Sequence, residues 1–295
     1  MKGRSRSVAA LAVAISALAA LMALAGTGTA SSQQTPLTAA LISDVGRFND
    51  KSFNQSQLAG LNRAKRVLKI KTLPLQSNSD ADYIPNLTTA LRRGSGAIVC
   101  AGFLMADACA RVANSSQGKT RQFAITDYPV QIPPVDVWIA GYKACAQRAN
   151  KGIKVLIGYS QDFVASDKCK TVAENLIAQN AKALFQVAGL CGLGTLKAAD
   201  EANIWGIGVD VDQYALAGNV LTSGIKRVDE GVFQFIKAVK TGAPLGTGNL
   251  SFDLANGGMG LGKTSPQVPK AIIASTNVLK QRIIDGKYTP PLVIK

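Results

Sequence analysis

The feature that most constrains this chain is an alternation of short apolar runs with longer amphipathic runs. Each apolar run has the length of a buried strand, and each amphipathic run repeats its apolar residues at helical spacing. In the first half we predict strands at 37–43, 69–75, 97–100 and 122–125, and helices at 53–67, 83–93 and 105–114. Strands and helices that alternate over short connections predict an α/β fold with a doubly wound parallel sheet.

Residues 128–134 interrupt this alternation with three prolines in seven residues. Neither a helix nor a central strand tolerates that density, so we interpret the segment as a crossover between two lobes. The alternation then resumes, with helices predicted at 136–150, 166–179, 195–202, 231–241 and 269–286, and strands at 154–159, 183–187, 205–209, 220–225 and, weakly, 250–254. We expect two lobes joined by a hinge. The first holds residues 36–129 and about 220–245, and the second holds 130–219 and about 246–295.

Composition excludes several classes of function. The chain has no histidine, which removes Ser-His-Asp and Cys-His catalysis and histidine-ligated zinc. Its formal net charge is +15, but the densest basic cluster, residues 63–71, contains no aromatic residue and is typical of a solvated surface. No close pair of carboxylates accompanies an activated nucleophile. We therefore predict no enzyme, no cofactor, no metal and no nucleic-acid partner.

The first 30 residues predict an export signal, with basic residues before position 7, an apolar run at 8–25 and small residues up to Ala30. An uncleaved anchor at 8–25 is the alternative. Thr27 occupies the place of the lipidated cysteine in a lipoprotein box. We thus expect a periplasmic, cell-envelope or extracellular protein without lipid attachment.

Five cysteines leave at least one unpaired if the exported chain forms disulfides. Cys169 begins a predicted helix, and Cys191 lies in the strand-end loop one unit later, so these two are candidates to pair. Cys100 and Cys109 bracket another strand-to-helix turn. No pair has CxxC spacing, which argues against redox or metal chemistry.

The loop after the first strand carries polar side chains around Phe53. Ligands of open α/β sheets bind beyond the carboxyl ends of the strands, and an aromatic face beside amides and carboxylates suits a flat, polar ligand. Asp44 and Asn54 belong to this loop. The alternative is that Asp50 and Ser52 merely cap the following helix and that Phe53 is core.

Three further strand-end features are candidates for binding. The carboxylates of Asp210 and Asp212 could accept hydrogen bonds from sugar hydroxyls, and Lys226 could keep such a carboxylate charged. The alternatives are that Asp212 caps a helix and that Lys226 lies at the surface. The loop 189–194 either approaches a ligand or forms a tight turn. Residues 257–264 fit a P-loop, but Pro266 and Pro269 interrupt the required helix, so we reject that interpretation.

Eight stretches together resemble the basic membrane protein family of ABC-transporter substrate-binding proteins, of the purine-nucleoside-receptor type. They are DVGRFNDKSFNQ (44–55), GFLMADA (102–108), FAITD (123–127), IPPVDVWIAGY (132–142), GYSQDF (158–163), FQVAGLCGLG (185–194), WGIGVDVDQ (205–213) and LTSGIKRVD (221–229). The resemblance implies a two-lobed, hinged fold of the type I periplasmic-binding class. It also implies a monomer that captures a nucleoside, with a purine favoured, for a membrane permease.

The resemblance also implies roles for individual residues. Phe53 and Phe163 match the two rings that sandwich the base, and Asp127 matches the carboxylate that reads its edge. The ribose-binding groups and the other pocket-lining residues correspond to Asp210 or Asp212, Lys226, Gly189, Asp44 and Asn54.

One departure from the family concerns the crossover. Only four residues join Asp127 to Ile132, where the family carries several dozen more, including a strand and a helix of the second lobe. Losing them exposes a sheet edge and an apolar face. The second lobe is therefore expected to be shortened. The alternatives to nucleoside binding are a degenerate member with impaired or no binding, and a binder of another small polar ligand such as a sugar.

Overall fold

The computed structural model describes residues 36–128, 134–245 and 249–294. The predicted export signal, its alternative as an anchor and most of the proline-rich crossover lie outside these residues. Leu37–Lys295 forms one compact unit. Within the described ranges, no helix has both the length and the apolar character needed to cross a membrane.

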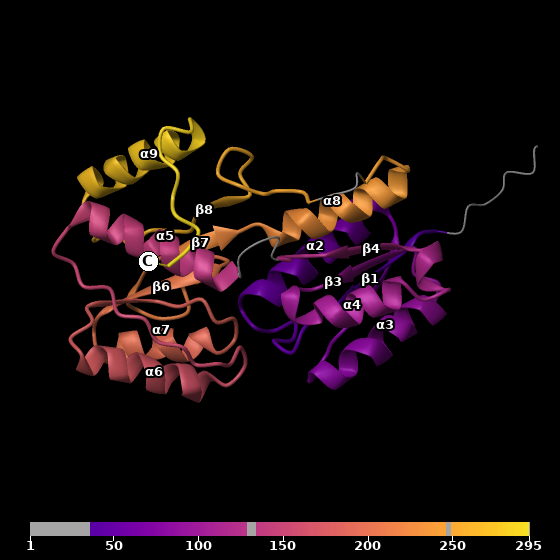
Figure 1. Cartoon of the computed structure of the whole chain (residues 1–295), viewed down its shortest axis with the longest axis horizontal. Helices are drawn as coiled ribbons and strands as arrows, with labels where there is room; N and C mark the ends of the chain where they lie inside the picture. The colour runs from indigo at the N-terminus through magenta and orange to yellow at the C-terminus, as the bar shows by residue number, and fades with distance from the viewer. Residues whose placement is uncertain (1–35, 129–133, 246–248, 295) are drawn as a thin grey trace, which may run out of the picture. The chain divides into compact units, whose positions relative to one another are not determined.

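The first lobe is a parallel four-stranded sheet with helices on both faces (Figure 1). Its strand order is β2-β1-β3-β4, made by β1 (Thr38–Ile42), β2 (Lys71–Leu75), β3 (Ala97–Cys100) and β4 (Gln122–Ile125). The α-helices are α2 (Phe53–Leu68), α3 (Tyr83–Arg92), α4 (Ala106–Ala113) and α8 (Val228–Thr241), and short 3₁₀ turns lie at Asp80–Asp82, Phe103–Met105 and Gly118–Thr120.

Both faces of this sheet are buried, which explains why its strands are continuous apolar runs. Ala39 and Leu41 of β1 pack with α2 and α8, whereas Ala40 and Ile42 pack with α3 and α4. Helices α2 and α8 approach so closely at Gly60 that a Cβ atom there would lie 2.3 Å from the backbone oxygen of Asp229. Helix α8 follows β7 of the second sheet and packs against α2, so this contact connects the second lobe to the first.

The second lobe has a sheet of order β5-β6-β7-β8. It is made by β5 (Ala183–Phe185), β6 (Trp205–Asp210), β7 (Val220–Lys226) and the antiparallel β8 (Met259–Leu261). Its helices are α5 (Pro134–Ala149), α6 (Ser166–Ala178), α7 (Gly192–Glu201) and α9 (Lys270–Ile284). Leu184 packs with α6 and α7, and the rings of Trp138 and Tyr142 in α5 contact Phe185 on the opposite face.

These elements confirm the predicted α/β fold of two doubly wound lobes, and most predicted ends differ by no more than three residues. Two predicted strands are wrong. Residues 154–159 form no strand, because no described neighbour pairs with them. Residues 250–254 also form no strand, because the chain turns at Asp253. Its carboxylate accepts the N–H groups of Ala255 and Asn256, and β8 forms later.

The predicted boundary between the lobes needs one correction. We placed residues 220–245 in the first lobe, but β7 pairs with β6 and β8 and is therefore part of the second sheet. The chain returns to the first lobe only after Lys226, and α8 and the following Leu245 pack there.

Candidate functional site

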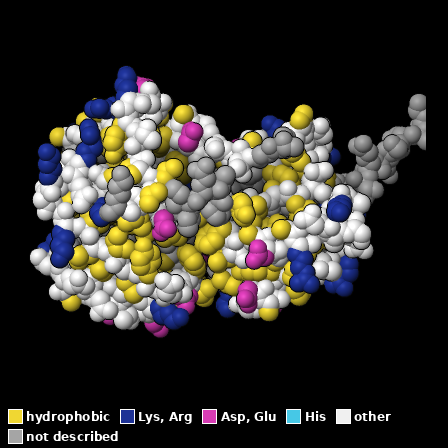
Figure 2. All heavy atoms as spheres, in the orientation of Figure 1, with side chains coloured by type: hydrophobic (Ala, Val, Ile, Leu, Met, Phe, Trp, Pro, Cys, Tyr) yellow, Lys and Arg dark blue, Asp and Glu magenta, His cyan; other side chains and the backbone are white. Residues whose placement is uncertain are grey.

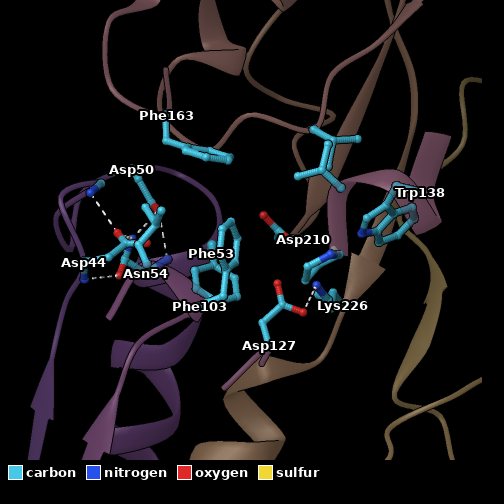
Figure 3. A pocket seen from close by; sticks show the side chains of 16 residues that line it. Asp44, Asp50, Phe53, Asn54, Phe103, Asp127, Trp138, Phe163, Asp210 and Lys226 are labelled. Carbon is cyan, nitrogen blue, oxygen red and sulfur yellow. Dashed lines mark hydrogen bonds and ion pairs between the residues drawn. The ribbon is translucent and has the colours of Figure 1, made fainter. Parts of the chain in front are cut away.

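A pocket lies where the carboxyl ends of strands from both sheets face each other (Figure 3). Its volume is about 560 Å³, including space that is open to solvent. The lining residues are Asp44, Gly46, Asp50, Phe53, Asn54, Phe103, Leu104, Asp127, Pro134, Val135, Trp138, Phe163, Val187, Gly189, Asp210 and Lys226.

Two of the lining carboxylates lie on left-handed backbone. Asp127, just after β4, has φ of 54°, and Asp210, at the end of β6, has φ of 66°. Aspartate is one of the few residues that tolerate this conformation, and such backbone concentrates at functional sites. The turn at each strand end therefore directs one carboxylate from each lobe into the pocket.

An ion pair crosses the pocket between Lys226 and Asp127. The ammonium group of Lys226 also lies 5.9 Å from the centre of the Phe53 ring. We expected Lys226 to hold the Asp210 carboxylate charged. Its direct bond is instead to Asp127, and it acts on Asp210 only through its charge.

Asp210 is a buried acid of the pocket, with 7% of its surface exposed. Burial raises the pKa of its carboxyl to about 6, against the opposing charge of Lys226 and a hydrogen bond from Ser52. That bond, from the Ser52 hydroxyl to Oδ2, measures 2.6 Å and joins the two lobes. Nearby, the side-chain amide of Gln213 donates to the carbonyl of Lys51 at 3.0 Å, so the lobes are linked at two adjacent points.

The loop before α2 holds a second buried acidic group. The Asn54 amide donates to Asp44 at 2.6 Å and to Asp50 at 3.2 Å. Burial raises the pKa of Asp44 to about 6 and raises that of Asp50. The capping interpretation is correct for Asp50, which accepts the N–H groups of Ser52, Asn54 and Gln55. It is wrong for the Ser52 side chain, which bonds to Asp210 instead.

Aromatic rings from both lobes enclose the same space. Phe53 and Phe103 come from the first lobe, and Phe163 lies across the pocket from them (Figure 3). The rings of Phe103 and Phe163 meet edge to face with centres 6.1 Å apart. Gly102, at φ of 94°, leaves room for Phe53, because a Cβ there would lie 2.9 Å from that ring.

The structure brings most of the predicted residues together. Those that line the pocket are Asp44, Phe53, Asn54, Asp127, Phe163, Gly189, Asp210 and Lys226. Asp212 does not line it. The carboxylate of Asp212 accepts the N–H groups of Tyr214 and Lys263 and so supports the chain after β8.

Sequence reasoning missed two aromatic lining residues. Phe103 follows a strand-end glycine, which was an available signal. Trp138 lies on α5 after the proline-rich segment, where nothing local indicated a pocket. The P-loop match at 257–264 contains strand β8 and is not followed directly by a helix, so it lacks the required context.

Two disulfides stabilise the strand-end regions. Cys169–Cys191 joins α6 to the loop that carries Gly189, and Cys100–Cys109 joins β3 to α4. Cys145 is free in the part of the chain that is described. No group of three or more potential metal ligands occurs among those residues.

Comparison with known proteins identifies a family with a matching sequence. The sequence model of the Bmp family, described as ABC transporter substrate-binding protein PnrA-like, matches residues 37–131 and 119–289. A CD4+ T-cell-stimulating antigen of Listeria monocytogenes is 28% identical over 86% of this chain and 88% of its own length. The ABC transporter nucleoside-binding protein BmpA of Lactococcus lactis is 28% identical over 99% of both chains.

Solved structures share the fold. An ABC transporter solute-binding protein from Aeropyrum pernix superposes with a TM-score of 0.69 at 22% identity, over 87% of this chain and 94% of that one. A solute-binding protein from Conexibacter woesei gives 0.65 at 19% identity, over 88% and 100%.

The alignments with relatives also include many positions that hold no residue of this chain. The one with the Listeria protein has 315 positions but covers 86% of the 295 residues, so about 60 positions hold no residue of this chain. The two family matches overlap at 119–131, beside the short connection from Asp127 to Ile132. With both family matches spanning nearly all of the described residues, the chain belongs to the Bmp family of PnrA-like ABC transporter substrate-binding proteins.

Proposed function

We propose that this protein captures a nucleoside, with a purine preferred, in the pocket between its lobes and delivers it to an ABC permease. Membership of the family supports an extracytoplasmic location and a role in binding rather than catalysis. The observation that carries the proposal is that one pocket combines aromatic rings and carboxylates from both lobes. A relative named as a nucleoside-binding protein adds support.

The base is assigned to the aromatic side of the pocket. We assign the flat base to stacking contacts with Phe53 and Phe163, which contribute about 1–3 kcal/mol. The Asp127 carboxylate accepts N–H groups from the edge of a base. Its ion pair with Lys226 offsets the cost of keeping it charged in a closed site.

The ribose is assigned to Asp210 and the Gly189 loop. With a pKa of about 6, Asp210 is ionised at pH 7 and accepts hydrogen bonds from hydroxyl groups. Asp44 and Asn54 line the same cavity. Among the described lining residues, Lys226 is the only one with a basic side chain, and it is already paired with Asp127. The surrounding carboxylates therefore disfavour a phosphate. The pocket therefore suits nucleosides over nucleotides.

Isothermal titration calorimetry of the purified protein tests this proposal with adenosine, guanosine, adenosine monophosphate and ribose. We expect nucleosides to bind and the monophosphate to bind more weakly. Phe163→Ala should weaken nucleoside binding roughly 5- to 150-fold, the equivalent of the lost stacking. Tyr214→Ala, a ring outside the pocket beside Lys263, is the matched control and should leave affinity unchanged.

Other outcomes would replace the proposal. Tight ribose binding that Phe163→Ala does not affect would indicate a sugar receptor. Failure of all four compounds to bind a cooperatively folded protein would indicate a member that has lost nucleoside binding.

A further inference from the structure

The two lobes repeat the same succession of elements, with one difference. In the first lobe, β1 and α2 are followed by β2, α3, β3, α4 and β4. In the second lobe, α5 is followed by residues 154–159, then α6, β5, α7 and β6. Residues 154–159 therefore correspond to β2, and β5 corresponds to β3. No described strand of the second lobe corresponds to β1.

In the first sheet, β1 lies between β2 and β3 and pairs with both. The position that corresponds to β1 therefore lies between residues 154–159 and β5. About 60 positions of the alignment with the Listeria protein hold no residue of this chain, and the two family matches overlap at 119–131. Both observations are consistent with the loss of this strand. Two groups of backbone hydrogen-bonding atoms are left without their common neighbour.

The first group is the outer edge of β5. Among the described strands, β5 pairs with β6 alone, so its other edge is open. An open edge with a strand-forming sequence is a template for another strand. The adjoining surface is apolar, because Figure 2 shows hydrophobic side chains gathered on the second lobe between α5 and α6.

The second group is the segment 154–159 itself, Lys-Val-Leu-Ile-Gly-Tyr. Its residues take part in none of the backbone hydrogen bonds of the described chain. It lies along α6, because a Cβ on Gly158 would be 2.6 Å from a methyl group of Val172. Ile157 and Tyr159 are nevertheless 38% and 54% exposed. Within the described ranges, this strand-like apolar segment therefore lies at the surface without a neighbouring strand.

We propose that these two groups pair between two copies of this chain. Residues 154–159 of one copy add to the free edge of β5 in the second copy, and the second copy reciprocates around a two-fold axis. We choose a second copy as the partner because each chain carries both components of the contact. Residues 154–159 lack a sheet edge to pair with, and the outer edge of β5 lacks a strand. An isologous contact requires this self-complementarity. The protein is then a dimer, unlike the monomer that the family resemblance implies.

Sedimentation velocity of the purified protein over a hundredfold range of concentration tests the proposal. We expect a species of twice the monomer mass that dissociates on dilution. Hydrogen–deuterium exchange should slow at least tenfold at high concentration in residues 154–159 and 183–185. Ile157→Lys should weaken dimerisation at least tenfold. Val278→Lys is the matched control, because Val278 is an exposed apolar residue on α9 and should have no effect.

A monomer at every concentration would overturn the proposal, as would a dimer that Val278→Lys dissociates or that shows protection elsewhere. If Ile157→Lys fails to fold, a synthetic peptide of residues 152–160 supplies the test with the wild-type protein. The peptide should convert dimer to monomer, and a dimer that withstands it would refute the pairing. Capture of the peptide by a protein that is always monomeric would also refute it, since the edge would then serve a different partner.

Discussion

Asp210→Asn should stabilise the protein at alkaline pH although it removes a group proposed to bind ligand. Burial raises the pKa of Asp210 from 3.8 to about 6, which means that the folded protein disfavours the ionised carboxylate. An asparagine is uncharged, tolerates left-handed backbone and keeps an oxygen that accepts the hydrogen bond from Ser52.

The magnitude follows from proton linkage. Below about pH 4 the carboxyl is protonated in both folded and unfolded states, so it contributes nothing. As the pH rises the unfolded chain ionises first and stability falls, until above pH 6 the cost is complete at about 1.4 kcal/mol per pKa unit. The variant should therefore be more stable than the wild type by about 3 kcal/mol at pH 8 and by roughly half of that at pH 5.

Urea denaturation at pH 5 and pH 8, followed by circular dichroism, measures these free energies. At pH 8 the difference corresponds to a rise in melting temperature of roughly 6–12 °C. Asp162→Asn is the control with the opposite sign. The Lys168 side chain and the backbone N–H groups of Ala165 and Val164 lower the pKa of Asp162 to about 2. Its stabilising effect is thus complete at both pH values, and its loss should be equal at both.

A difference for Asp210→Asn that is the same at pH 5 and pH 8 would refute this reasoning. A variant that is less stable than the wild type at pH 8 would refute it as well. Either result would mean that burial does not determine the ionisation of this carboxyl.

Nucleoside affinity should rise with pH and level off above about pH 6, because a ligand hydroxyl that donates to the ionised Asp210 lowers the pKa of this carboxyl. Calorimetry that shows the same affinity at pH 5 and pH 8 would contradict this expectation. Gly60→Ala should destabilise the protein by about 1–3 kcal/mol, because the added methyl meets a backbone oxygen of α8. Gly141→Ala in α5, which meets no described atom within 4 Å, should be neutral or stabilising, and equal denaturation midpoints for the two variants would exclude the crowding argument. Replacing Cys169 and Cys191 by serine should reduce the free energy of unfolding by about 3 kcal/mol, as expected for a crosslink across 22 residues, and a loss below about 1 kcal/mol would argue against that role.

Helices and strands whose own residues show a clear apolar run or a helical periodicity could be predicted from the sequence. The apolar run that forms β1 and the helical periodicity of α2 contain the information for both elements, because each buries its own apolar residues. Residues 154–159 have an equally good strand sequence and form no strand. A strand exists only with a hydrogen-bonded neighbour, and the sequence of the strand does not specify that neighbour.

The candidate site divides in the same way. Asp127 and Asp210 follow predicted strands, so their place at the carboxyl end of a sheet could be inferred. Trp138 reaches the pocket only because α5 packs against Phe185, and Lys226 pairs with Asp127 only because the two lobes meet. Contacts of that kind depend on tertiary packing. Asp212 had the same strand-end signal as Asp210, but the turn after β6 directs it toward Lys263.

If the chain is exported as its first 30 residues predict, the order of the cysteines has a consequence for folding. A chain that crosses a membrane from its N-terminus presents Cys100 and then Cys109, so the first native disulfide forms between the first two thiols to emerge. Cys145 emerges next and has no native partner, and Cys169 therefore arrives beside a free thiol before Cys191 has appeared. Oxidation in order of emergence would join Cys145 to Cys169, and thiol–disulfide exchange must then transfer Cys169 to Cys191. If the thiols oxidise in this order, maturation of the second lobe requires disulfide isomerisation, whereas that of the first does not.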